Sequence, residues 1–135
     1  MVPPRCPLPR ERLGGRAVFG LLANLYAVES ARNWGAGDCG DLATLVDFAG
    51  TIGAAFVGVN PLHALSNVRR EISPYSPVSR LYRNPLYLDV TAVPELVETP
   101  SVARRLAGPA FQRTLARLRS GAHVDYAGSW PSSGR

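Results

Sequence analysis

The chain of 135 residues is long enough for one compact domain of ordinary size. Its hydrophobic fraction of 46% supports a core, and its charged fraction of 19% is too low for a disordered chain. All 15 basic residues are arginine, which excludes chemistry that needs a lysine, such as a Schiff base or a P-loop phosphate site. The net charge of +5 arises in residues 101–135, because residues 1–100 hold nine arginines and nine acidic residues.

The two cysteines, Cys6 and Cys39, belong to no CxxC pair and no Cys/His cluster. They support neither a zinc site nor a disulfide framework, and they favour a reducing compartment. The start of the sequence lacks the apolar core of a signal peptide, and no apolar run long enough to span a membrane follows. We therefore expect a cytoplasmic protein that has no membrane span.

Two apolar runs predict the strands of an α/β fold. Residues 1–15, rich in Pro, Arg and Gly, are typical of an extended leader, and the run at 17–26 then predicts a strand covered on both faces. A second run, at 54–59, predicts another strand of the same kind. With a helix between them, two such strands form a βαβ unit and pair in parallel.

The connecting helix is predicted from its ends as much as from its apolar stripe. Asp38 is suited to the N-cap, and Asp41, three residues later, adds negative charge at the positive end of the helix dipole. Apolar residues then recur at helical spacing over 39–52, and Gly53 stands where a left-handed C-terminal cap is usually glycine.

The second half of the chain gives weaker signals. Residues 62–84 form a long segment rich in Pro, Ser, Tyr and Arg, and residues 85–90 could form a short strand. A segment of this length without regular structure is usually functional or disordered, and its aromatic content favours function. Residues 101–120 show helical spacing interrupted by Gly108 and Pro109, which predicts one helix or two short ones.

Tyrosine rings, hydroxyls and amides gather in the loop at 73–87, a mixture that suits sugars, although a Pro-rich loop packed on the core has the same composition. His63 follows the second strand at the end where α/β folds place binding groups, yet a lone histidine is more often structural. Trp34, which comes after the first strand with Arg32 and Asn33, could face the same cleft or plug a barrel end.

Two further motifs admit a functional and a structural explanation. The GxGxxG string at 35–40 lies between strand and helix, but it begins too far after the strand for a dinucleotide site, and Asp38 would face the pyrophosphate. No acidic residue follows the second strand to bind a ribose hydroxyl. The arginines of 101–120 could bind nucleic acid, although such residues more often form the solvated face of an amphipathic helix.

Longer strings carry a resemblance to a family. They are, in order, SARNWGAGDCGDL at 30–42, FVGVNPLHAL at 56–65, SPYSPVSR at 73–80 and NPLYLDV at 84–90. Together they closely resemble the 4-alpha-glucanotransferases, also called amylomaltases or disproportionating enzymes, of glycoside hydrolase family 77. Tyr126 also resembles a later position of this family, so the likeness extends toward the end of the sequence.

The resemblance implies a (β/α)8 barrel that moves a segment of a 1,4-alpha-glucan to an acceptor sugar with retention, without cofactor or metal. Retention needs a nucleophile and an acid/base carboxyl group about 5 Å apart, which in this family lie on later strands. The Ser-Pro-Tyr motif of the family matches Ser73 and Tyr75, whose ring would stack on the sugar. Trp34, Asn60 and His63 match positions around the mouth of the cleft.

On this basis the chain is expected to be the N-terminal portion of the barrel, with the βαβ unit, substrate loop and following helix at 16–126 and an atypical tail at 127–135. The native reading frame is expected to end near Tyr126. Alone, the chain should lack transferase activity, because no catalytic residue is assigned to it, and it should fold poorly. A non-catalytic glucan-binding fragment that uses the same tyrosine loop is the alternative, and the oligomeric state stays open.

Overall fold

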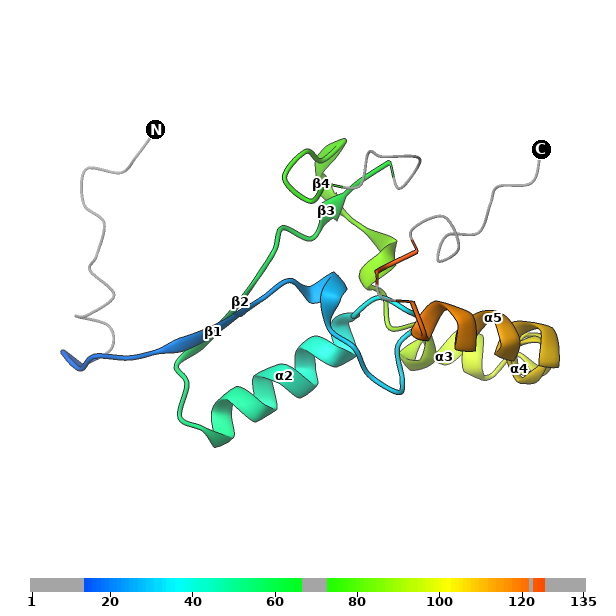
Figure 1. The fold of residues 1–135 in the computed structure, drawn as a ribbon, viewed down its shortest axis with the longest axis horizontal. Coiled ribbons are helices and arrows are strands. Elements are labelled where there is room, and N and C mark those ends of the chain that lie inside the picture. Colours follow the sequence, from blue (N-terminus) through cyan, green and yellow to red (C-terminus); the bar gives the residue numbers. More distant parts are fainter. Residues whose placement is uncertain (1–13, 67–72, 122, 126–135) are drawn as a thin grey trace.

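The computed structural model describes residues 14–66, 73–121 and 123–125. Strand β1 (Gly20–Ala23) pairs in parallel with β2 (Phe56–Val59), and helix α2 (Cys39–Thr51), which connects them, lies along the pair (Figure 1). The strand–helix–strand unit predicted from the sequence is confirmed. Residues 1–13 of the leader predicted at 1–15, which include Cys6, lie outside the described residues, as do Tyr126 and the tail at 127–135.

Cross-strand packing in the β1–β2 pair joins a glycine on one strand to a large side chain on the other. Gly20 is the register partner of Phe56, and Leu22 is the partner of Gly58. The Phe56 ring and the end of the Leu22 side chain occupy the space that a Cβ on the facing glycine would need. Both large side chains stay mostly exposed, Phe56 at 53% and Leu22 at 83%. The face of the pair that carries these side chains is therefore packed across its strands but uncovered by the rest of the described residues.

A reciprocal cap starts α2. The Asp38 carboxylate accepts hydrogen bonds from the backbone N–H groups of Gly40 and Asp41, at 2.8 and 3.1 Å, and the Asp41 carboxylate accepts one from the N–H of Asp38 at 3.0 Å. These bonds satisfy backbone donors that have no partner within the helix. Gly53 has a φ of +75° just beyond the helix. The helix predicted over 39–52 is confirmed to within one residue.

The strand predicted over 17–26 is too long. β1 ends at Ala23, and a 3-10 turn, η1 (Leu25–Ala27), follows it. The backbone N–H of Leu25 donates to the side-chain oxygen of Asn60 at 2.7 Å, so it is not available to a strand ladder. The Leu25 side chain is completely buried at this point, with 0% exposure. A side chain distant in sequence therefore ends the strand within its apolar run.

An antiparallel hairpin that the sequence did not reveal occupies the long segment after β2. It consists of β3 (His63–Ala64) and β4 (Ser79–Arg83). The strand suggested at 85–90 is wrong: two 3-10 turns, η2 (Pro85–Tyr87) and η3 (Val90–Ala92), lie there instead. Asn84 accepts the N–H of Leu86 at 3.1 Å and so caps the first of these turns.

Three helices complete the described chain: α3 (Pro94–Val97), α4 (Pro100–Ala107) and α5 (Pro109–Arg119). Each begins with a proline at its first position, where the missing N–H costs no hydrogen bond. Gly108 separates the last two, which confirms two short helices. They gather beside the start of α2, away from the far end of β1 and β2 (Figure 1). None of the helices in the described ranges is long and apolar enough to cross a membrane.

Candidate functional site

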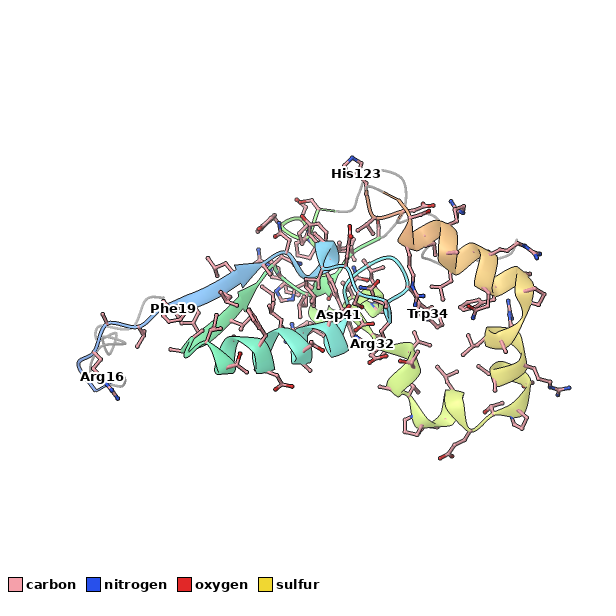
Figure 2. All side chains as sticks on the ribbon, turned by 60° about the horizontal axis from the view of Figure 1, so that its bottom comes forward. Arg16, Phe19, Arg32, Trp34, Asp41 and His123 are labelled. Atoms are coloured by element: carbon pink, nitrogen blue, oxygen red, sulfur yellow. The ribbon has the colours of Figure 1, made fainter. Side chains whose placement is uncertain are left out.

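Arg32 joins three segments at the carboxyl end of β1. Its Nη2 donates to Asp38 at 2.8 Å and to Asp41 at 2.9 Å, and its Nη1 donates to Asp89 at 2.7 Å. The hydrogen bond to Asp38, with the attraction of all three carboxylates, raises the pKa of Arg32 against the opposing effect of burial. The loop after β1, the start of α2 and the segment before η3 are thereby held together. Figure 2 shows Arg32 and Asp41 close to each other at this point.

Asn33 extends this cluster into the interior. Its amide, in a residue only 2% exposed, donates to Asp41 at 2.8 Å and to the carbonyl of Val28 at 2.9 Å. Burial by itself would raise the pKa of Asp41, but hydrogen bonds from Asn33, Ser30 and the Asp38 backbone, together with Arg32, hold it below its ordinary value. The carboxylate thus stays charged beneath the loop.

Helix α5 reaches the same loop through Arg119. Its Nε donates to the carbonyl of Asn33 at 2.8 Å, and its Nη2 donates to the carbonyl of Arg32 at 3.0 Å. Arg117, one of the other arginines of the helix, pairs with Asp125 at 3.0 Å. Part of the basic stretch that could have faced a nucleic acid is therefore engaged within the chain.

Asn60 lies at the end of β2, buried between three segments. Its Oδ1 accepts from the N–H of Leu25, and its Nδ2 donates to the hydroxyl of Tyr87 at 2.9 Å and to the carbonyl of Pro61 at 3.0 Å. Burial raises the pKa of the Tyr87 hydroxyl, and the hydrogen bond from Asn60 partly offsets that rise. The residue expected at the mouth of a cleft is thus a buried connector.

Asn60 also lines a depression of about 360 Å³ at the carboxyl ends of β1 and β2, together with Asn24 and Tyr75. Tyr75 is 71% exposed. Its backbone N–H donates to the Ser73 hydroxyl at 3.4 Å, which draws the Ser-Pro-Tyr segment into a turn. The structure therefore brings Tyr75 and Asn60 to one hollow. Ser73 lies two residues before Tyr75 in the same turn.

Trp34 and His63 lie apart from that depression. The Trp34 ring meets Phe111 of α5 edge to face, with centroids 5.0 Å apart, and it lines a separate hollow of about 320 Å³ with residues of 85–91. The described residues therefore do not bring Trp34 to the depression at the strand ends, and its place in a common cleft stays a prediction. His63 stands in β3, where its Nδ1 lies 3.4 Å from a guanidinium nitrogen of Arg83.

The glycine-rich string has a structural explanation. A Cβ at Gly37 would collide with the carbonyl of Leu25, and one at Gly40 would occupy the space of the Arg32 guanidinium and the Asp89 carboxylate. These glycines permit close packing of the loop. In the residues that the structure describes, no three His, Cys, Asp or Glu side chains gather as a metal site would require.

Sequence reasoning missed Asp89 and Tyr87, which close the two polar clusters. Both lie in the segment NPLYLDV, which carries part of the family resemblance. The partner of Asp89 is 57 residues away and that of Tyr87 is 27 residues away, so no local pattern identifies them. The Asn-Pro pair at 84–85, a typical turn start, was the one local signal.

Comparison with known proteins places the chain in a family. The sequence profile of the 4-alpha-glucanotransferases, glycoside hydrolase family 77, matches residues 23–132. The 4-alpha-glucanotransferase of Haemophilus influenzae is 38% identical over 127 residues, or 93% of this chain and 18% of that protein. That of Mycobacterium tuberculosis is 45% identical over 102 residues, or 70% of this chain and 14% of that protein.

Comparison with solved structures indicates the same family. The crystal structure of amylomaltase from Corynebacterium glutamicum superposes with a TM-score of 0.64 and 33% sequence identity, over 76% of this chain and 14% of that one. The chain belongs to the 4-alpha-glucanotransferase family, and the resemblance noted from its motifs is confirmed. It spans less than a fifth of the length of these relatives.

Proposed function

We propose that this chain is part of a 4-alpha-glucanotransferase and supplies loops of its glucan-binding cleft. The observation that carries the proposal is the exposed Tyr75 ring beside the depression at the carboxyl ends of β1 and β2. Parallel barrels build their active sites at that end of their strands. In this proposal, β1, α2 and β2 are the first βαβ unit of a (β/α)8 barrel, within a functional region at 16–126.

The proposed reaction moves a 1,4-alpha-glucan segment to an acceptor sugar by a retaining double displacement. This reaction needs a free nucleophile and a free acid/base carboxyl group. Asp38, Asp41 and Asp89 are all bound to Arg32, so we assign none of them to catalysis. We assign substrate contact to Tyr75, through stacking, and to Ser73, through polar contact. Asn60 borders the same depression as a buried support. A place for Trp34 and His63 around the mouth of the complete cleft stays a prediction from the family resemblance.

The proposed partners are maltooligosaccharides or 1,4-alpha-glucans, and no cofactor or metal is required. A tyrosine ring presents a flat apolar face to the C–H groups of a glucose ring, and neighbouring hydroxyls and amides can bind the hydroxyls at its rim. The cytoplasmic location stays a prediction from cysteine usage. The alternative, a non-catalytic glucan-binding role, uses the same Tyr75 loop. Only a test of catalysis distinguishes it from a part of a transferase.

Binding by the full chain is the first test. Saturation-transfer NMR with maltoheptaose should show contact to the wild-type chain, a strong loss with Tyr75→Ala and a smaller loss with Tyr75→Phe, which keeps the ring. Tyr82→Phe serves as the control, since this ring lies exposed on β4. Incubation with maltotriose should yield neither glucose nor longer glucans. Products that disappear with Tyr75→Ala would contradict the assignment of no catalytic residue.

A chimera tests the transferase assignment itself. The 102 aligned residues of the Mycobacterium tuberculosis relative, 45% identical, are replaced by those of this chain. The chimera should disproportionate maltotriose, and Tyr75→Ala within it should lower kcat/KM, because a stacking contact to the reacting sugar is lost. A folded but inactive chimera would favour the non-catalytic alternative.

A further inference from the structure

We propose that Asn60 and Tyr87 form a clasp that positions the loop carrying Tyr75 for glucan binding. The inference rests on the proposed function, since it concerns how the same site is held in shape. In the clasp, the Asn60 amide links the backbone after β1, through Leu25, to the Tyr87 hydroxyl in η2. Neither residue needs to touch the sugar in order to affect its binding.

The hydrogen bonds of Asn60 assign it to positioning rather than to ligand contact. An asparagine amide has two N–H donors, and both are used here, one on Tyr87 at 2.9 Å and one on the Pro61 carbonyl at 3.0 Å. The oxygen already accepts from Leu25 at 2.7 Å. The side chain is buried, although the residue borders the depression. A glucan oxygen could therefore accept from this amide only by breaking one of the two bonds that its N–H groups make.

The clasp joins the two ends of the β3–β4 hairpin segment, which carries Tyr75. Asn60 stands just before the hairpin, and Tyr87 stands just after it. Beyond the clasp, the backbone N–H of Asn84 donates to the carbonyl of Leu62 at 3.0 Å, and that of Val78 donates to the carbonyl of Ala64 at 3.0 Å. The bond to Leu25 fixes these ends to the segment after β1, and the last residues of β1 also line the depression.

Tyr75 depends on this clasp because its own ring is largely exposed. A ring with little packing of its own takes its orientation from the backbone that carries it, and extra orientations in the free protein must be lost on binding. Pro74, directly before it, is buried and gives the loop one local anchor. Loosening the clasp should therefore weaken glucan binding by allowing Tyr75 to move away from the depression.

The test is a double-mutant cycle on the full chain, with maltoheptaose affinity as the readout. Tyr87→Phe removes only the hydroxyl and should weaken binding about threefold to tenfold, the effect of one buried neutral hydrogen bond. In a Tyr75→Ala background the same change should have no further effect, because the residue through which it acts is gone. Tyr82→Phe, on the exposed face of β4, should leave affinity unchanged in both backgrounds.

Asn60→Leu repeats the cycle from the other partner. It keeps the number and branching of the side-chain heavy atoms and removes all three hydrogen bonds. It should weaken binding more than Tyr87→Phe, again only when Tyr75 is present. All affinities are measured below the melting temperature of each variant, so that unfolding does not imitate a loss of binding.

Two outcomes overturn the clasp alone. Wild-type affinity in Tyr87→Phe would show that the bond positions nothing, and equal losses with and without Tyr75 would show a merely structural role. Both results leave the proposed function intact, provided that Tyr75→Ala alone weakens binding. Absence of maltoheptaose binding by the wild-type chain, or full binding by Tyr75→Ala, would instead overturn the proposed binding site and the clasp with it.

Discussion

The two ends of the β1–α2–β2 unit are built in opposite ways. At the carboxyl end of the strands, polar side chains are paired: the half-buried Arg32 with three carboxylates, and the buried Asn60 with Tyr87. At the other end, apolar side chains such as Phe19 and Phe56 are about half exposed. Figure 2 shows Phe19 at the far end of β1, well away from Arg32 and Asp41.

The difference shows that the described residues supply partners for the polar groups at one end but leave apolar side chains exposed at the other. A buried polar network fixes one geometry only when every member has its partner, and here the partners of Arg32, Asn33 and Asn60 all lie within the described residues. Exposed apolar faces of this extent are usually covered in the native assembly. The described residues therefore supply the partners that fix the end bordering the candidate site, whereas they leave the apolar side chains at the opposite end about half exposed.

The largest effect is expected for Arg32→Ala. This change leaves Asp38, Asp41 and Asp89 close together without their cation, and repulsion should separate the loop from α2. The free energy of unfolding should fall by about 2–4 kcal/mol, toward the lower value because the Arg32 side chain is 37% exposed. Urea denaturation followed by circular dichroism measures it. Arg113→Ala on α5 is the matched control. If it lowered the free energy of unfolding as much as Arg32→Ala does, the three carboxylates around Arg32 would have no special role in stability.

The next effect is a change in pH dependence. The pKa of Asp41 is lower in the folded chain than its ordinary value of 3.8, so the unfolded chain binds its proton first as the pH falls. The stabilisation from Asp41 is therefore present at neutral pH and is lost below about pH 4. Asp41→Asn should cost about 1–2 kcal/mol at pH 7 and less at pH 3. A difference from wild type that does not change between these pH values would contradict the assignment.

A smaller effect is expected where the loop meets α5. Phe111→Leu keeps an apolar side chain but removes the edge-to-face contact with Trp34. Such a contact contributes about 0.5–1.5 kcal/mol beyond the area it buries. Thermal unfolding should report this loss, and Trp34 fluorescence should shift as the ring loses its neighbour. An unchanged melting temperature would show that the contact between Trp34 and Phe111 adds nothing to the stability of the fold.

The smallest effect on stability is expected on the uncovered face of the β1–β2 pair. Leu22→Thr replaces an 83% exposed side chain with another that favours strands, so the free energy of unfolding should change by less than about 0.5 kcal/mol. Self-association and the binding of a hydrophobic dye should both decrease. If Leu22→Thr instead unfolded the chain, the faces of β1 and β2 would be essential to this chain's own core.

Local chemistry could be read from the sequence, and distant pairing could not. The limits of α2 followed from Asp38, Asp41 and Gly53, because capping acts within a few residues. The end of β1 was misjudged, since an apolar run contains no sign that the amide of Asn60, 35 residues away, takes the N–H of Leu25. The position of Tyr75 near the strand ends was anticipated only through the family resemblance, and the structure adds how its loop is held.

The contact between Arg119 and the loop after β1 has a consequence for synthesis on the ribosome. The carbonyls of Arg32 and Asn33 accept hydrogen bonds from Arg119, which is synthesised 87 and 86 residues after them. The β1–α2–β2 unit can form as soon as residue 59 has left the exit tunnel, but this loop completes its hydrogen bonds only after α5 has emerged. A nascent chain paused before residue 119 should therefore expose the loop to proteases that the finished chain resists.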